Sequence, residues 1–382
     1  MKRMDEVDCA KAVGICLIVL SHIFGGMGLG ANAVWRWLDP FMVGIFFVMS
    51  GYLAAQRRRH SDSSSDAGQF RRYAAKKAGT LLVPYLSFSV AALVIKLGIA
   101  HMIGGSLREQ AEPAVREFVT FLGTGTLWFL PTLFFAEMLF FGVIRLPRWG
   151  KGLVLATSVW VSYAALPVIT AIHYSSFYEQ CGTLLIWGCD YLYVIFRSLV
   201  ALGLMILGYE GMPRLERWNV GWKMENESRT GGGTGRSGSE GFLIAISALV
   251  TLTVPLVFFP DFRALDFGPA AVLLYVDSLA AAIFFVALFR WLGTRLSLEP
   301  IATIGQNSLI IMCTHNEWYL VQIFRFGLEG LLGVCAVIGP RYYLECGAML
   351  VLILMTEQGL CDVLNRYAGL LIGRRTPSVG KP

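Results

Sequence analysis

Two histidines lie inside long apolar stretches of this sequence, where ionisable side chains are rare. His22 comes near the end of the stretch from Asp8 to Phe24, and His315 lies within N-S-L-I-I-M-C-T-H-N-E-W. Ionisable groups at membrane depth are costly, and they usually face a protein interior or a water-filled cavity. A histidine is also a natural general base for a hydroxyl, because its unperturbed pKa lies near neutral. These positions predict a proton-transfer site; the simpler alternative is a histidine bonded to a backbone carbonyl.

The first apolar stretch carries its polar residues on one side. A helix turns by about 100° per residue, so Lys11 and His22 fall within roughly 20° of each other and about 16 Å apart along the axis. Asp8 precedes Lys11 by three residues and lies on nearly the same face. We interpret this stripe as half of an active site, in which Asp8 holds Lys11 in place.

A second polar stripe surrounds His315. Asn307 and Ser308 lie two turns earlier, and Asn307 is eight residues from His315, on nearly the same helix face. If this segment packs against the first, the two histidines share a cavity. His315 or Asn307 would then bind a substrate or a developing oxyanion.

Four further polar or aromatic residues lie in apolar segments. Ser50 is a candidate for substrate binding, although a serine there is typical of helix packing. Trp128 has the position of an interfacial-belt residue, and its alternative role is to contact a substrate. Glu137 and Asp277 are costly at membrane depth, so we expect them to pair with Arg197 or with each other.

The loop over 57–78 is short and strongly basic, with the sequence R-R-R-H-S-D-S-S-S-D-A-G-Q-F-R-R-Y-A-A-K-K. Such runs commonly set membrane topology and contact anionic headgroups. The alternative is a site for a phosphorylated cytoplasmic ligand. Arg72, Lys76 and Lys77 run directly into the next apolar segment, and their spacing points them toward one pocket.

Composition indicates how these residues are positioned. The chain has 382 residues, of which 55% are hydrophobic and 15% charged, and its mean hydropathy is +0.60. These values are too apolar for a soluble domain and predict an all-α integral membrane protein. The net charge of +6 must therefore be read from its distribution, and it does not indicate nucleic-acid binding. No cleavage site follows the first apolar run, so we expect that helix to be retained.

About ten apolar segments are long enough to cross a bilayer, and we treat 1–382 as a single domain. Lys and Arg concentrate in alternate loops, which predicts that both termini are cytoplasmic. The loops predicted to face outside hold only Arg36, Arg108, Arg116, Arg263, Arg325 and Arg341. The predicted spans are 9–24, 40–56, 79–99, 127–145, 152–172, 191–208, 242–259, 269–290, 301–323 and 346–368.

Two loops have their own patterns. The segment 209–240 contains T-G-G-G-T-G-R-S-G-S-E-G, which predicts a flexible cytoplasmic tether and lacks the Gly-Lys-Ser/Thr ending of a phosphate loop. An outer loop contains Cys181 and Cys189, which could form a disulfide in an oxidising compartment. The spacing of the cysteines matches no zinc pattern, and we predict no metal.

Several motifs occur together in a characteristic order. Asp-x-x-Lys precedes the histidine of the first span, F-F-V-M-S-G-Y-L closes the second, and K-K-x₆-P-Y opens the third. L-W-F-L opens the fourth span, L-G-Y-E follows the sixth, and I-G-Q-N-S-L-x₅-H lies in the ninth. In this order the sequence resembles the acyltransferase-3 family of integral membrane acyltransferases, from Asp8 to about His315.

The resemblance implies a fold of about ten spans and a reaction. Family members move an acyl group, usually acetyl, from cytoplasmic acyl-CoA to a glycan hydroxyl, and they include enzymes of bacterial surface polysaccharides. His22 matches the family's catalytic histidine, and Lys11, Lys76 and Lys77 match cations that would hold the donor's phosphates. The family often has Arg-x-x-Arg where this chain has Lys77 and Thr80, so Arg72 or Lys76 would substitute. We expect no fused extracytoplasmic domain.

The residues and the resemblance lead to one hypothesis. The chain is expected to be an O-acetyltransferase of the bacterial inner membrane, with acyl-CoA, membrane lipids and a cell-surface or lipid-linked glycan as partners. His22 acts as the general base or as a transient acyl carrier. The alternatives are a transporter or flippase for a glycan or lipid-linked sugar, and a non-catalytic scaffold. No internal repeat supports the transporter, and two intramembrane histidines count against the scaffold.

Overall fold

The computed structural model describes residues 4–29, 32–58, 67–173, 182–230, 235–258, 260, 267–335 and 337–373, without the side chains over 215–240. Within these ranges the regular structure is helical and contains no strand, as the sequence predicts. The helices not discussed individually below are α2 (Ala33–Leu38), α8 (Arg148–Trp160), α9 (Leu166–His173) and α12 (Gly235–Thr253).

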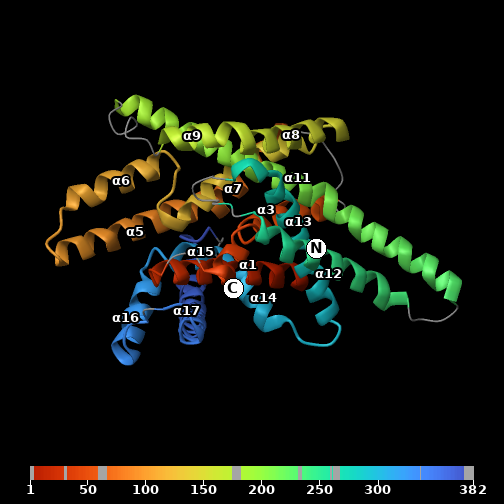
Figure 1. Cartoon of the computed structure of the whole chain (residues 1–382). Coiled ribbons are helices and arrows are strands. Elements are labelled where there is room, and N and C mark those ends of the chain that lie inside the picture. Colours follow the sequence, from red (N-terminus) through yellow and green to blue (C-terminus); the bar gives the residue numbers. More distant parts are fainter. Residues whose placement is uncertain are drawn as a thin grey trace, which may run out of the picture.

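Helix α1 (Asp5–Gly26) lies in the middle of the bundle (Figure 1). Its neighbours are α3 (Gly44–Arg58), α13 (Val272–Leu292), α14 (Glu299–Gln306) and α17 (Pro340–Tyr367). A Cβ atom on Gly305 would overlap the backbone oxygen of Asp8, so this glycine is what lets the α14 backbone reach α1. The polar stripe of α1 therefore faces protein on several sides rather than lipid.

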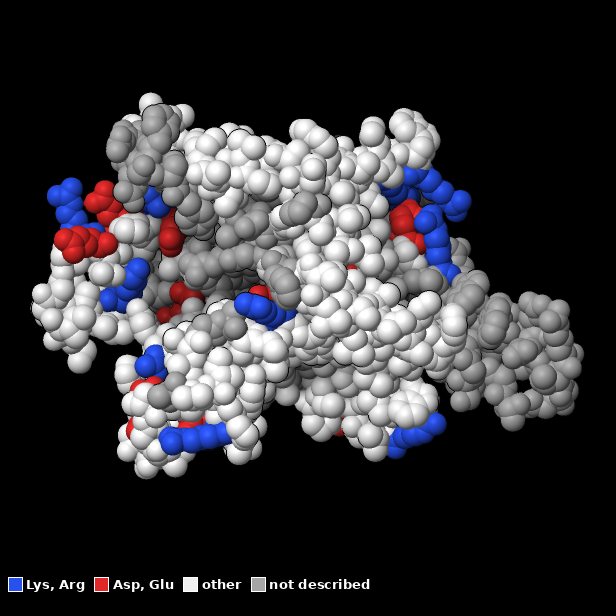
Figure 2. All heavy atoms as spheres, in the orientation of Figure 1, with Lys and Arg blue, Asp and Glu red and all other residues white. Residues whose placement is uncertain are grey.

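Among the residues that the structure describes, seven helical segments are long and apolar enough to cross a membrane, so the chain is an integral, multi-pass membrane protein. The exact count of about ten and the sides of the termini stay predictions. Charged side chains gather toward the left and right ends of the view in Figure 2, with a largely uncharged surface between them. The seven segments are Asp5–Gly26, Gly68–Met102, Gly125–Val143, Arg148–Ile172, Thr183–Arg214, Val272–Leu292 and Pro340–Tyr367.

The segment predicted as one span over 301–323 is broken into pieces. Helix α14 ends at Gln306, α15 covers Ser308–Thr314, and α16 (Leu320–Leu332) starts in a new direction after Tyr319, whose φ is +59°. A left-handed backbone conformation changes the chain direction locally. It is unfavourable for a residue with a large side chain, so it persists only where the surrounding structure holds it. The break places residues 315–319 as a turn in the protein rather than as the middle of a helix.

The flexible tether predicted over 209–240 is wrong for most of its length. Helix α11 runs without interruption from Thr183 to Thr230, and α12 begins at Gly235. The residues before the glycine-rich stretch include strong helix formers, and Glu210 pairs with Arg214 at i,i+4 with a distance of 2.7 Å. Local helix propensity thus extends the span beyond the apolar stretch, and residues 231–234, between the two helices, lie outside the described residues.

Helices α5 (Val83–Met102) and α6 (Leu107–Val119) form a pair that projects from one end of the bundle (Figure 1). Helix α4 (Ala67–Lys77) joins α5 through a π-helical turn at Ala78–Leu82, so the two form one long segment. Side chains on α5 such as Val94 and Met102 are exposed, as expected for residues that face lipid. On the predicted topology this projecting end lies on the outer side of the membrane.

Candidate active site

The structure brings the two intramembrane histidines together. His22, near the end of α1, and His315, which follows α15, have ring centroids 5.1 Å apart and an interplanar angle of 57°. The contact requires the first and ninth predicted segments to pack on each other, and they do. The two polar stripes identified in the sequence therefore meet at their histidines.

His315 is completely buried, and its hydrogen bonding defines its protonation. Its Nδ1 lies 2.6 Å from the backbone oxygen of Ile311. A carbonyl can only accept, so Nδ1 carries the proton and Nε2 of the neutral ring is left as an acceptor. No donor among the described residues reaches that Nε2 atom. The simpler alternative for a lone histidine, a backbone hydrogen bond, thus holds for one ring nitrogen and leaves the other available.

The residue before His315 anchors this histidine to another helix. The hydroxyl of Thr314 lies 2.8 and 2.7 Å from the two carboxyl oxygens of Glu357 on α17. Both residues are fully buried. This contact fixes α15 against α17 and thereby fixes the position of His315.

His22 lines a cavity of about 350 Å³ between α1 and α7 (Phe129–Val143). Ser21, Trp35 and Asp39 line it from the N-terminal part of the chain, and Thr126 and Trp128 line it from the start of the fourth predicted span. The cavity combines a histidine, hydroxyls, a carboxylate and indole rings. This lining suits a polar substrate with a ring-shaped apolar face.

Trp128 is part of the wall of this cavity. Its side chain is only 8% exposed, and the guanidinium of Arg197 lies 4.8 Å from its ring centroid. Arg197 is itself buried and donates to the backbone oxygen of Leu122 at 3.0 Å. Tertiary packing thus covers the ring on one side and leaves the cavity on the other, which favours the substrate-contact role over the interfacial one.

Glu317 builds one wall beside the cavity. Its carboxylate accepts a hydrogen bond from the backbone N–H of Thr126 at 3.0 Å and from the side chain of Asn316 at 3.2 Å. The hydroxyl of Thr126 in turn lies 2.7 Å from the backbone oxygen of Met312. These bonds join the turn after α15 to the start of α7, so the two sides of the site move as one unit.

At the other end of the stripe Lys11 pairs with Asp8. The Lys11 Nζ lies 2.6 Å from the carboxylate of Asp8, and the Lys11 side chain is 23% exposed. The role that the sequence suggested for Asp8, to hold Lys11, agrees with this contact. Lys11 lies about 16 Å along α1 from His22, at the end predicted to be cytoplasmic.

The cations before α5 do not share one environment. Lys77 is ion-paired with Glu137, which also accepts from the hydroxyl of Tyr73. Arg72 and Lys76 are exposed, and no carboxylate in the described part of the chain pairs with either of them. The expectation that Glu137 pairs with Arg197 or Asp277 is wrong, because Lys77 is nearer in the fold.

Asp277 is buried without a partner. Both of its carboxyl oxygens lack a hydrogen bond to any described residue, and its side chain is fully covered. Its expected pairing with Arg197 or Glu137 is therefore wrong as well. The structure gives no explanation for a buried carboxylate at this position.

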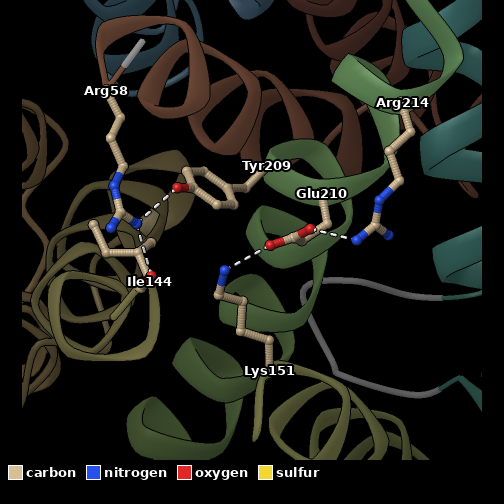
Figure 3. A network of polar contacts seen from close by, with 6 residues as sticks. All are labelled: Arg58, Ile144, Lys151, Tyr209, Glu210 and Arg214. Carbon is tan, nitrogen blue, oxygen red and sulfur yellow. Dashed lines mark hydrogen bonds and ion pairs between the residues drawn. The ribbon is translucent and has the colours of Figure 1, made fainter. Parts of the chain in front are cut away.

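A second basic region surrounds Glu210 (Figure 3). Glu210 binds Lys151 at 2.6 Å and Arg214 at 2.7 Å, and Arg58 donates to the hydroxyl of Tyr209 at 2.9 Å. Arg58, Arg148 and Lys151 line an open pocket of about 360 Å³. The sequence pattern of Arg148 and Lys151 had indicated topology alone, whereas Arg58 belongs to the basic loop 57–78.

Two predicted site residues lie elsewhere. The amide of Asn307 contacts Gln358 at 3.4 Å and Asn365 at 3.2 Å on α17, and it does not line the His22 cavity. Ser50 is half-buried in α3 and lines none of the cavities described here. The predicted disulfide involves Cys181, which lies outside the described residues.

Comparison with known proteins agrees with this arrangement. A family profile described as an acyltransferase domain matches residues 4–355. The chain belongs to the acyltransferase-3 family. Searches of curated proteins and of solved structures found no match. The family match covers α1, the cavity and both histidines, and it makes the protein a membrane acyltransferase.

Several residues around the site carry no sequence signal of their own. Trp35, Asp39 and Thr126 reach the cavity from short helices or turns, and Glu317 follows His315 by two residues. A carboxylate at the end of an apolar segment was a signal that could have selected Glu317. The others depend on contacts between distant segments, which periodicity does not reveal.

Proposed function

We propose that this acyltransferase moves an acyl group, acetyl in the simplest case, from cytoplasmic acyl-CoA to a hydroxyl of a glycan at the bacterial inner membrane. His22 acts as the general base. The observation that carries the proposal is the His22–His315 contact beside a cavity lined by Trp128. A neutral imidazole with a buried neighbour and an adjoining polar cavity is suited to removing a hydroxyl proton.

The donor would enter from the side of α1 that carries Lys11. Arg72 and Lys76 are exposed and have no carboxylate partner among the described residues, so they are the best candidates to bind the donor's phosphates. Lys77 is a weaker candidate because Glu137 already neutralises it. A second candidate phosphate site is formed by Arg58, Arg148 and Lys151. Substituting this group and the Arg72–Lys76 group separately would show which of them binds the donor.

The chemical step balances with the residues at hand. His22 removes the proton of the sugar hydroxyl, and the oxygen attacks the carbonyl carbon of the thioester. A C–O bond forms, the C–S bond breaks, and the proton passes from His22 to the CoA thiolate. Ser21 and Thr126 lie on the cavity wall, where a hydroxyl or backbone donor can stabilise negative charge on the carbonyl oxygen.

A covalent version uses the same residues. The His22 imidazole first attacks the thioester carbonyl: an N–C bond forms, the C–S bond breaks, and CoA leaves as the thiol with the imidazole proton. The sugar oxygen then attacks the acyl carbon, the N–C bond breaks, and the hydroxyl proton passes to the released imidazole nitrogen. This route would separate donor and acceptor in time, so a donor bound at the inner side and an acceptor bound at the outer side need not meet. Trp128 would stack on the sugar ring in either version.

Proteoliposomes that contain the purified protein test the proposal against a glycan transporter. Acyl-CoA labelled in the acyl group is supplied on one side, and sugars labelled in the ring are supplied in parallel. We expect acyl label in the glycan and release of one CoA per acyl group. Movement of unmodified sugar across the membrane, with all acyl label still on CoA, would show that the protein is a transporter.

A further inference from the structure

A second cavity, of about 400 Å³, lies beside the first and has a different character. It is a groove between the projecting α5–α6 pair and the turn that leads into α16. Its apolar side includes Val90, Leu93 and Val115, and its polar side includes Lys96, Asn316 and Gln322. Val90 is 55% exposed and Val115 46% exposed, so the apolar side opens toward the lipid.

The groove and the His22 cavity share the same two walls. Thr124 lines the groove, while Gly125 and Thr126 line the His22 cavity. Met312 lines the cavity, and Glu317 lines the groove. On one wall the linings are adjacent, at Thr124 and Gly125, and on the other wall residues 313–315 separate Met312 from Asn316, so a molecule in the groove lies next to the His22 cavity.

Lys96 is the cation among the described residues that line the groove, and Glu317, the carboxylate that also lines it, already accepts hydrogen bonds from Thr126 and Asn316. Lys96 lies on the α5 face that also carries Ser89 and Leu93, all of which line the groove. It is about 9 Å along the axis from Met102, the end of α5 on the predicted outer side. No carboxylate among the described residues pairs with Lys96, and a lysine at this depth in an apolar wall calls for an anion.

The polar side of the groove has unused hydrogen-bonding capacity. The side-chain oxygens of Ser89 and Gln322 are buried, and neither has a hydrogen-bond partner in the described part of the chain. Buried polar groups nearly always have a partner. Together with Asn316, they provide donors and acceptors of the kind that sugar hydroxyls require.

We propose that this groove binds the acceptor as a lipid phosphate that carries the sugar. The hydrocarbon chain lies against Val90, Leu93 and Val115, the phosphate pairs with Lys96, and the sugar contacts Asn316 and Gln322 on its way to the His22 cavity. The acceptor is then a lipid-linked glycan rather than a finished polysaccharide. The identification of the bound lipid as the acceptor rests on the proposed acyl transfer. Binding of a lipid phosphate in the groove does not depend on that transfer.

Photo-labelling with a defined probe tests the groove. The whole protein in phosphatidylcholine nanodiscs is exposed to diazirine-bearing farnesyl phosphate or to the matching alcohol, and labelled peptides are mapped. We expect labels within 89–96, 114–119 and 316–322, and binding of the phosphate about tenfold tighter than the alcohol. Lys96→Gln should bring the phosphate down to the affinity of the alcohol.

Arg108→Gln is the matched control, because Arg108 is a cation on α6 whose side chain is 90% exposed. It should leave labelling unchanged. Label placed elsewhere, or a Lys96→Gln protein that still prefers the phosphate, would overturn the proposal. Phosphatidylglycerol that competes as well as farnesyl phosphate would also overturn it, because the groove would then bind ordinary phospholipid.

The photo-labelling experiment measures lipid binding and does not require acyl transfer. Specific labelling in a protein that transfers no acyl group would leave the groove established and reject the proposed function. Acyl transfer to a soluble sugar with no labelling of the groove would reject the groove and keep the function.

Discussion

Substituting Lys77 separates a structural role from a donor-binding role. Lys77 and Glu137 form an ion pair in which the side chains are 16% and 4% exposed. Removing one partner of such a pair leaves an uncompensated buried charge, which costs about 3 kcal/mol or more. We therefore expect Lys77→Met to lower the apparent Tm of the purified protein by several degrees.

The neighbouring lysine provides the control. Lys76 is exposed, so Lys76→Met should leave Tm unchanged and weaken acyl-CoA binding by about tenfold, the value of one charge-assisted hydrogen bond. The double variant Lys77→Met with Glu137→Gln removes both charges and should recover most of the lost Tm. Thermal unfolding and titration of acyl-CoA, measured on the same preparations, give both quantities.

The reasoning has a clear point of failure. If Lys77→Met keeps the wild-type Tm and weakens acyl-CoA binding as much as Lys76→Met, then Lys77 is a donor ligand. The ion pair with Glu137 would then be incidental, and the assignment of the donor phosphates to Arg72 and Lys76 would be wrong.

Three further predictions concern the site and its support. His315→Gln should lower kcat while leaving the Kd for acyl-CoA near wild type, as measured by steady-state kinetics and titration, because the buried His315 ring lies 5.1 Å from the His22 ring and positions it; an unchanged kcat would show that His22 does not need this neighbour. Trp128→Ala should raise the KM for the acceptor, with Trp128→Phe closer to wild type, because an aromatic contact is worth about 1 kcal/mol; a change in donor KM alone would contradict this. Gly305→Ala should destabilise the protein by about 1–3 kcal/mol, because the added methyl group meets the backbone of Asp8, whereas Gly142→Ala, which meets nothing within 4 Å, should not lower Tm.

The sequence was most informative where one helix carried the pattern. The spacing of Asp8, Lys11 and His22 placed them on one face, and the Asp8–Lys11 pair follows from that spacing. Predicting the contact between His22 and His315 required one further assumption, that their two segments pack on each other. The polar stripe on each segment made that packing plausible. Helical periodicity is reliable over such distances because the residues belong to a single rigid element.

The sequence was least informative where distant segments meet. The partner of Glu137 is Lys77, and the ring of Trp128 is covered by Arg197; neither contact has a periodic signal. The error over α11 has a different cause. The polar composition after residue 208 predicted a loop, but local helix propensity continues the helix to Thr230. The groove beside α5 was also missed, because it depends on the turn at Tyr319.

The central claim is that His22 performs the transfer, and radiolabelled acyl-CoA tests it directly. The purified wild-type protein and the His22→Ala variant are compared for acyl transfer to the glycan, with acyl-CoA binding measured on both. We predict that His22→Ala binds acyl-CoA normally and transfers no acyl group above background. Acyl transfer that persists in a correctly folded His22→Ala protein would contradict the account.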